Sequence, residues 1–288
     1  MPRILIAGCG YVGEATADYF YGAGWEVEGW TASKDSAEKL SAKPYSTRAV
    51  DISDRDQVSA AVEDFDAVIH CASTRGGNVD LYRCVYLEGA RNLIARFTGS
   101  TFLFTSSTSV YAQKNGEQVT EESAADPLHE TGKVLREVEN VVLEHGGIVV
   151  RLAGIYGPGR SSLLRKFLEG QAQIDSVTER FINQVHRDDI ASALFFLLNR
   201  RMESQVRAIF NIVDNQPMLE RECYEWLAAR LHRPLPDVTA SRPARKRGDS
   251  NKRVSNQKLR ALGWEPRYPS FQVGMSESVL PNFERLGA

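Results

Sequence analysis

The first twenty residues hold the feature that most constrains the fold, the stretch ILIAGCGYVGEATADYF. The pattern Gly8-x-Gly10-x-x-Gly13 follows a short apolar run directly and precedes residues with helical spacing. In a strand–turn–helix unit the first glycine permits a tight turn, the second lets the backbone approach a pyrophosphate, and the third allows close helix–strand packing. The start of the helix presents N–H groups and a partial positive charge. The pattern predicts a dinucleotide-phosphate cradle at Gly8, Gly10, Tyr11, Val12 and Gly13.

Strand-like and helix-like stretches alternate through the first half of the chain. Short apolar runs rich in β-branched or aromatic residues lie at 4–7, 26–30, 67–71, 101–105 and 148–152. Helical spacing occupies the stretches between them, at 11–21, 55–62, 79–97 and 129–143. This alternation predicts an α/β fold, a Rossmann-like doubly wound parallel sheet with helices on both faces.

The pattern loosens after about residue 155. It predicts helices at 161–168, 188–198 and 219–231, a strand at 208–213, and a loop in the proline- and arginine-rich stretch 234–249. We therefore expect two domains. An NAD(P)-binding Rossmann domain would span 1–155 and be completed by about 182–213. A smaller C-terminal substrate lobe would span 156–181 and 214–288.

Composition excludes several classes of function. The 288 residues carry a formal net charge of −2, which gives no global reason to expect nucleic-acid or membrane partners. No run of 18 apolar residues is present, and the N-terminal apolar run is too short for a signal-peptide core. The four cysteines (Cys9, Cys71, Cys84 and Cys223) form no C-x-x-C pair, so neither a disulfide framework nor a metal site is predicted. We expect a cytoplasmic protein with reduced thiols.

The end of the second strand bears on which dinucleotide binds. NAD sites usually place an acid there for the ribose 2′-hydroxyl. Here Thr31, Ser33 and Lys34 occupy that turn, and the first carboxylate, Asp35, stands where it could cap the next helix. The hydroxyls and the lysine favour NADP, with NAD as the alternative.

By its motifs the chain resembles the extended short-chain dehydrogenase/reductases of the NAD-dependent epimerase/dehydratase type. The stretches that carry the resemblance are AVDISDRDQV, DAVIHCAS, FLFTSSTSVYA, VVRLAGIYGPGR, NQVHRDDIASAL and RVSNQKLRALGWEP. The resemblance implies that Asp51 and Ile52 contact the adenine and that Cys71 and Ala72 line the cofactor. It places Ser107 at the catalytic serine position.

Several departures from the family pattern indicate an atypical subgroup. In the family's Tyr-x-x-x-Lys motif the tyrosine position is His129, while Lys133 is kept and is implied to bind the nicotinamide ribose. Tyr86 replaces the usual asparagine of the family's fourth helix, which corresponds to residues 79–97 here. Unperturbed histidine titrates near ~6.5 against ~10 for tyrosine, and a neutral imidazole can act as a base near neutral pH.

Three hypotheses for the missing tyrosine stay open. His129 performs proton transfer, or it is a residue left after activity was lost, or another donor replaces it. The candidate donors are Tyr86, Tyr111 and Tyr156.

The basic stretch SRPARKRGDSNKR, residues 241–253, is a candidate for binding an anionic substrate. Arginine suits phosphate because its planar fork donates two parallel hydrogen bonds, and Arg245, Arg247 and Arg160 are the candidates here. The alternative is a solvated basic loop. Nucleic-acid binding is not expected, because the segment lacks interleaved aromatic residues.

Two functions from different classes are consistent with these patterns. One is an NAD(P)-dependent oxidoreductase or epimerase that acts on a sugar-like or nucleotide-sugar substrate. The other is a catalytically silent NADP-binding sensor or scaffold. In many relatives the fourth helix and the helix that follows His129 form a dimer interface, so the resemblance also implies a homodimer.

Overall fold

The computed structural model describes residues 1–62, 64–74, 76–176, 179–203, 208–240 and 250–286. The chain divides into two compact units. The first comprises 1–110, 125–151 and 190–210, and the second comprises 111–124, 152–189 and 211–288. The second unit therefore takes residues 111–124, 152–155, 182–189 and 211–213, which the division expected from sequence had placed in the first domain.

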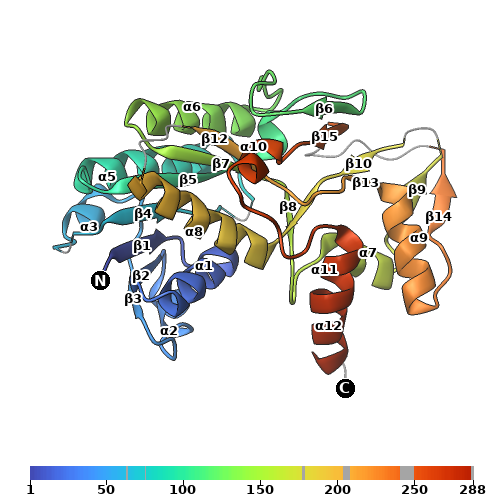
Figure 1. The fold of residues 1–288 in the computed structure, drawn as a ribbon, viewed down its shortest axis with the longest axis horizontal. Helices are drawn as coiled ribbons and strands as arrows, with labels where there is room; N and C mark the ends of the chain where they lie inside the picture. Colours follow the sequence, from blue (N-terminus) through green and yellow to red (C-terminus); the bar gives the residue numbers. More distant parts are fainter. Residues whose placement is uncertain (63, 75, 177–178, 204–207, 241–249, 287–288) are drawn as a thin grey trace. The chain divides into compact units, whose positions relative to one another are not determined.

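The first unit alternates strands and helices (Figure 1). Its elements are β1 (Arg3–Ala7), α1 (Tyr11–Gly22), β2 (Glu26–Thr31), α2 (Lys34–Glu38), β3 (Ser46–Ala49), α3 (Arg55–Ser59), β4 (Ala67–His70), α4 (Val79–Tyr82), η1 (Arg83–Glu88), α5 (Gly89–Arg96), β5 (Thr101–Ser107), η2 (Thr108–Val110) and α6 (Glu130–Glu144). Three further elements run across a boundary between the units, β7 (Ile148–Leu152), α8 (Arg187–Glu203) and β12 (Ile209–Ile212).

A seven-stranded sheet forms the centre of this fold, in the order β12-β7-β5-β4-β1-β2-β3. The pairs β1–β2, β1–β4, β2–β3 and β4–β5 are parallel. Strands β4 and β7 are buried along their whole length, as expected of strands covered on both faces. The predicted Rossmann-like sheet is confirmed. The strand order reverses between β1 and β4, which is where ligands bind in open α/β sheets.

Three local predictions need correction. The single helix expected over 79–97 is interrupted by the π-helix η1, a feature that often marks functional sites. The helix expected over 55–62 ends at Ser59, and Val62 is 82% exposed, so no apolar face extends the helix that far. Strand β3 was missed because its sequence, STRA, has no apolar alternation.

The second unit is built from short elements. They are β6 (Glu117–Val119), β8 (Gly154–Tyr156), α7 (Ser162–Leu168), β9 (Gln173–Asp175), β10 (Phe181–Ile182), β11 (Gln184–His186), β13 (Met218–Leu219), α9 (Glu220–Leu231), β14 (Asp237–Thr239), β15 (Lys252–Val254), α10 (Gln257–Ala261), α11 (Phe271–Gly274), η3 (Met275–Val279) and α12 (Leu280–Leu286). Four two-stranded sheets pair β8 with β11, β9 with β14, β6 with β15 and β10 with β13. Strand β14 lies in the stretch expected to be a loop.

One apolar core holds the second unit together. Side chains of α7, α9, α11 and η3 supply it, among them Phe167, Tyr224, Leu227 and Phe271. In the part of the chain that the structure describes, no helix is both long enough and apolar enough to cross a bilayer.

Candidate functional site

The turn between β1 and α1 shows why its three glycines are required. Gly8 has a φ of +105°, and a Cβ added to it would overlap the backbone nitrogen and Cα of Ala72. A Cβ on Gly13 would overlap the carbonyl oxygen of Gly8. A Cβ on Gly10 would meet no protein atom within 4 Å. Two glycines are therefore required by the protein's own packing, and the third borders open space.

The open position is the one that a pyrophosphate needs. Gly10 is the N-cap of α1 and no side chain caps this helix. Tyr11, Val12 and Gly13 form the first turn, whose N–H groups lack partners within the helix and carry the positive end of its dipole. The predicted cradle residues fit the phosphates of a dinucleotide on this geometry.

Two thiols at the cradle have structural roles. Cys71 Sγ donates to the carbonyl oxygen of Gly8 at 3.3 Å, and Cys9 Sγ would lie 2.8 Å from a Cβ on Gly29. Burial raises the pKa of the Cys9 thiol to about 12 and raises that of Cys71 as well. Both thiols stay protonated, so Cys71 joins the end of β4 to the glycine turn as a hydrogen-bond donor.

At the end of β2 the hydroxyl groups already have partners. Thr31 Oγ1 donates to the carbonyl of Ser33 at 3.1 Å, and Ser33 Oγ accepts from the amide of Ser36 as the N-cap of α2. Ser33, rather than Asp35, therefore caps this helix. Lys34 is exposed in its first turn. Of the three residues expected to receive a 2′-phosphate, Lys34 is the one whose charge suits it.

Sequence reasoning missed a buried acid on β2. Glu28 accepts from the indole nitrogen of Trp30 at 2.6 Å and from Arg48 on β3 at 3.3 Å. Arg48 lies opposite Trp30 in the strand register. Because β3 was not predicted, no sequence signal placed an arginine beside the end of β2.

The loop after β3 is tied to α5. The Asp51 carboxylate accepts from both the amide and the hydroxyl of Ser53, at 3.0 and 2.8 Å. Asn92 on α5 donates to the carbonyl of Ile52 at 3.0 Å, and Gly89 leaves room for the Ile52 side chain. These bonds give Asp51 and Ile52 a defined place. Their proposed contact with adenine stays a prediction.

The residue before the candidate catalytic serine, Ser106, belongs to a buried polar network. Ser107 Oγ accepts from the amide of Ser109 at 3.2 Å. The hydroxyl of Ser106 points to α6 and donates to Glu139 Oε1 at 2.6 Å. Arg151 on β7 donates to both oxygens of Glu139, at 3.0 and 2.7 Å, and Arg136 donates to the same carboxylate.

This network connects three elements next to Ser107 in the chain. Glu139 is fully buried and the side chain of Arg151 is 1% exposed, so the pair is shielded from solvent. It links α6 to the adjacent strands β5 and β7. The sequence offered no signal for it, because its members are 12 and 33 residues apart along the chain.

The structure places His129 and Lys133 at the exposed start of α6. His129 is the N-cap, its side chain makes no capping bond, and the helix begins at Glu130 rather than at His129. Lys133 Nζ pairs with Glu130 Oε1 at 2.6 Å, and both side chains are more than half exposed. The ionic partner of Lys133 is therefore Glu130, on the same helix.

The three tyrosines considered as replacement donors are buried. Tyr111 donates to Asn211 Oδ1 at 2.9 Å and Tyr156 lies 3.5 Å from the carbonyl of Ser270. Burial raises the pKa of Tyr86, opposed by a hydrogen bond with Ser73, and burial also raises the pKa of Tyr156. Tyr111 and Tyr156 are each 1% exposed, so burial favours structural roles for both.

Of the three predicted substrate arginines, Arg160 lies within the described residues. Arg245 and Arg247 lie outside the described residues, and Arg160 is exposed in the turn that follows β8. His186 accepts from the amide of Asp188 at 3.2 Å through Nδ1, and Asp189 accepts from the amides of Arg267 and Tyr268. Within the described residues no cluster of three metal-ligating side chains occurs.

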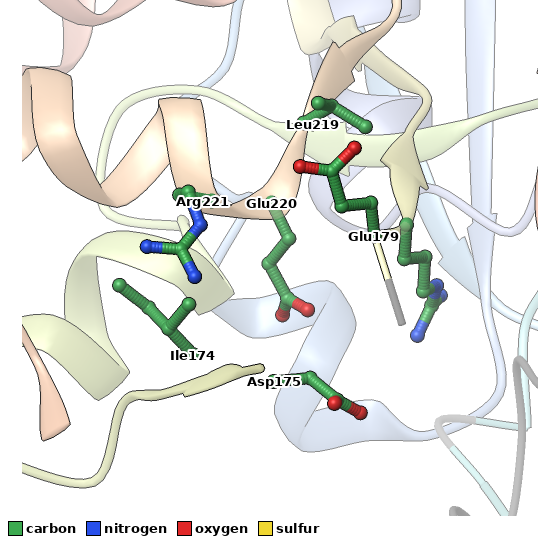
Figure 2. Close-up of a pocket in the computed structure, with 7 residues that line it drawn as sticks. Ile174, Asp175, Glu179, Leu219, Glu220 and Arg221 are labelled. Atoms are coloured by element: carbon green, nitrogen blue, oxygen red, sulfur yellow. The ribbon is translucent and has the colours of Figure 1, made fainter. Parts of the chain in front are cut away.

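A small pocket lies in the second unit between β9 and the start of α9 (Figure 2). Its lining is mixed in charge, with Ile174, Asp175, Glu179, Arg180, Leu219, Glu220 and Arg221. Figure 2 shows Glu220 and Arg221 extending from α9 toward Ile174 and Asp175. No sequence pattern pointed to this pocket, because its lining comes from three separate stretches of chain.

Comparison with known proteins assigns the family. Protein YeeZ of Escherichia coli K12 is 27% identical over 281 residues, which cover 93% of this chain and 97% of that protein. A provisionally assigned NAD-dependent epimerase/dehydratase from Methylobacillus flagellatus is 26% identical with a TM-score of 0.81, over 98% of this chain and 99% of that one. The UDP-glucose 4-epimerase of Thermotoga maritima, solved with UDP-glucose, is 18% identical with a TM-score of 0.84, over 99% and 100% of the two chains.

The first two similarities extend over nearly the whole chain, and the third shows the shared fold. The family model "NAD dependent epimerase/dehydratase family" matches residues 4–212, which include the glycine cradle, the serine turn and the start of α6. The resemblance inferred from the motifs is confirmed. This chain belongs to the NAD dependent epimerase/dehydratase family.

Proposed function

We propose that the protein is an NAD(P)-dependent oxidoreductase or epimerase that acts on a sugar-like or nucleotide-sugar substrate. The observation that carries the proposal is the open space at Gly10, between two glycines that the protein's own packing requires. A dinucleotide pyrophosphate is the ligand whose approach needs such a position at a helix N-terminus. The UDP-glucose in the Thermotoga maritima relative supports the substrate class.

The bound nicotinamide would accept or donate a hydride. The chain would hold the cofactor through Gly8–Gly13 and the residues that follow β2, β3 and β4, and Lys133 would contact the nicotinamide ribose. Ser107 would hydrogen-bond the reacting substrate oxygen. His129 would exchange a proton with that oxygen, which a neutral imidazole can do near neutral pH.

Cofactor use is tested by calorimetric titration with NADP⁺ and NAD⁺, comparing Gly10→Ala with Gly22→Ala. Gly10 is the N-cap of α1 and Gly22 is the last residue of the same helix. At both positions an added Cβ would meet no protein atom within 4 Å. Stability should change little in either variant. Gly10→Ala should weaken cofactor binding at least tenfold, while Gly22→Ala should bind like wild type. Equal affinities for the two variants would remove the cradle from the proposal.

A second candidate function is a catalytically silent NADP-binding sensor or scaffold. The exposed positions of His129 and Lys133, and the pairing of Lys133 with Glu130, favour it. The two functions are separated by following NADPH absorbance and epimer formation with a panel of nucleotide sugars. Turnover that His129→Ala abolishes supports the enzyme and assigns the histidine. Cofactor binding without turnover across the panel supports the silent protein.

NADP is the proposed cofactor, with NAD as the alternative, because Lys34 is the cation in the turn after β2. Lys34→Glu should lower the affinity for NADP⁺ more than that for NAD⁺. Equal losses for both would assign the preference to another residue. A homodimer through the helical segment 79–97 and α6 also stays a prediction, which light scattering would test.

A further inference from the structure

His70, the last residue of β4, is a histidine that the first unit shields completely from solvent. Its Nε2 lies 3.3 Å from the backbone carbonyl oxygen of Tyr86, which belongs to the π-helix η1. The rings of Phe104 and Tyr86 flank the imidazole, with centroids 5.2 and 6.2 Å away. His70 therefore connects the central sheet to the irregular part of the helical segment 79–97.

The carbonyl partner determines where this imidazole carries its hydrogen. A carbonyl oxygen only accepts, so Nε2 bears the hydrogen and donates to Tyr86. Among the described residues, Nδ1 of His70 has no hydrogen-bond partner, so a second proton there would leave a buried donor and a buried charge unpaired. Burial accordingly lowers the pKa of His70 to about 4. At neutral pH the side chain is thus a neutral Nε2–H donor.

The two residues that follow His70 pack against the glycine turn. The amide of Cys71 donates to the carbonyl of Ala7 at 2.9 Å, and its Sγ donates to the carbonyl of Gly8 at 3.3 Å. A Cβ on Gly8 would lie only 2.2 Å from the backbone nitrogen of Ala72. Because close-packed interiors transmit displacements, a movement of the end of β4 is passed directly to the turn.

The same helical segment also borders the loop after β3. Gly89 follows η1 directly and begins α5. A Cβ on Gly89 would lie 2.8 Å from Ile52 Cδ1 and 3.6 Å from His70 Nε2. Ile52 is the residue expected to contact the adenine. The bond between His70 and Tyr86 therefore holds a segment that packs against two parts of the expected cofactor site.

We propose that His70 is a positioning residue for the dinucleotide, whose bond to the Tyr86 carbonyl holds η1 against the end of β4 and keeps the glycine turn in the shape that accepts the pyrophosphate. This role rests on the proposed cofactor function. Because His70 is fully buried, it acts without touching the ligand. Without the donor, only ring packing would join η1 to the strand, and apolar contact is not directional.

The test is a calorimetric titration of the full chain and three variants with NADP⁺ and NAD⁺. His70→Leu loses the donor, whereas His70→Gln keeps an N–H donor of similar reach. Val68→Ala is the packing control, because Val68 is buried on the same face of β4. His70→Leu should weaken binding of both dinucleotides about tenfold, and His70→Gln should restore it to within about threefold. Val68→Ala should bind like wild type, although it unfolds at a lower urea concentration.

Nuclear magnetic resonance supplies a readout that a change in overall stability does not move. In a two-bond ¹H–¹⁵N correlation spectrum at neutral pH, the imidazole signals that disappear in His70→Gln belong to His70. They should show a hydrogen on Nε2 and none on Nδ1. Amide hydrogen exchange over residues 83–91 should be faster in His70→Leu and close to wild type in His70→Gln.

Several results would overturn the positioning role. They are unchanged affinity in His70→Leu, a loss that His70→Gln does not restore, and a hydrogen on Nδ1. An equal loss of affinity in Val68→Ala would assign the effect to a general loosening of β4 and would also overturn it. Wild type that binds neither dinucleotide would end the proposed cofactor function as well, whereas wild-type binding that His70→Leu leaves unchanged ends only the role of His70.

Discussion

The Glu139 network offers the sharpest test of how the first unit is held together. Its carboxylate accepts from Ser106, from two nitrogens of Arg151 and from Arg136, in a region where Glu139 and Arg151 are almost completely buried. Removing one member of a buried ion pair leaves the other charge buried and uncompensated, at a cost of about 3–5 kcal/mol. Glu139→Gln should lower the free energy of unfolding by that amount.

Two companion variants separate charge burial from packing. Ser106→Ala removes one hydrogen bond to an ion, so it should cost about 1.5–3 kcal/mol. The double variant Glu139→Leu with Arg151→Met removes both charges and keeps apolar volume. It should therefore be more stable than Glu139→Leu alone or Arg151→Met alone, with a favourable coupling energy of about 2 kcal/mol or more in the double-mutant cycle.

Urea denaturation followed by circular dichroism measures these differences through the transition midpoints at constant slope. Arg83→Met is a suitable control, because Arg83 pairs with Glu137 at the surface, where ion pairs contribute at most about 1 kcal/mol. A loss below about 1 kcal/mol for Glu139→Gln would refute the reasoning. Strict additivity in the double-mutant cycle would refute it equally.

Three further predictions address other parts of the molecule. Burial raises the pKa of Asp189 to about 6, above its unfolded value of about 3.9, so protonated Asp189 adds to the free energy of unfolding below pH about 4, and this contribution is lost as the pH rises to about 6. Asp189→Asn should remove this loss of about 3 kcal/mol, measured by denaturation at a series of pH values from 4 to 7. Gly274→Ala would drive its methyl into the hydroxyl of buried Tyr156, so it should cost about 1–3 kcal/mol, and less in a Tyr156→Phe background, by thermal denaturation. Lys133→Met breaks an exposed pair and should change stability by less than about 1 kcal/mol while weakening NAD(P) binding in calorimetry; unchanged affinity would remove Lys133 from the cofactor site.

Local sequence patterns were sufficient for most of the first unit. The five strands predicted in the first half of the chain are present to within two residues, because buried parallel strands appear as short apolar runs. The later helices at 161–168, 188–198 and 219–231 also have counterparts in α7, α8 and α9. Strand β3 escaped detection because its polar residues are held by pairing with β2 and not by a pattern of their own.

The features of the candidate site likewise fall into those that local sequence predicts and those that it does not. The glycine spacing alone predicted the tight turn between β1 and α1, since the backbone conformation at Gly8 and the close contacts at Gly8 and Gly13 leave no room for a Cβ. The helix expected over 79–97 contains a π-helix, and no periodicity in the sequence indicated it. The start of α6 at Glu130 and the pairing of Lys133 with Glu130 likewise became visible only with the helix in place.

By itself, the sequence indicated the family, the glycine turn between β1 and α1, and the strands and helices of the first half other than α2, β3 and β6. Those features depend on contacts among residues close together in the chain. The tertiary structure alone decided that Glu139 joins Ser106 to Arg151 and that Lys252 is buried against the carbonyl of Tyr111. Ser106 and Glu139 are 33 residues apart, and Lys252 reaches the carbonyl of Tyr111 across 141 residues. Burial and pairing over such separations follow from how the chain packs, and no local pattern carries them.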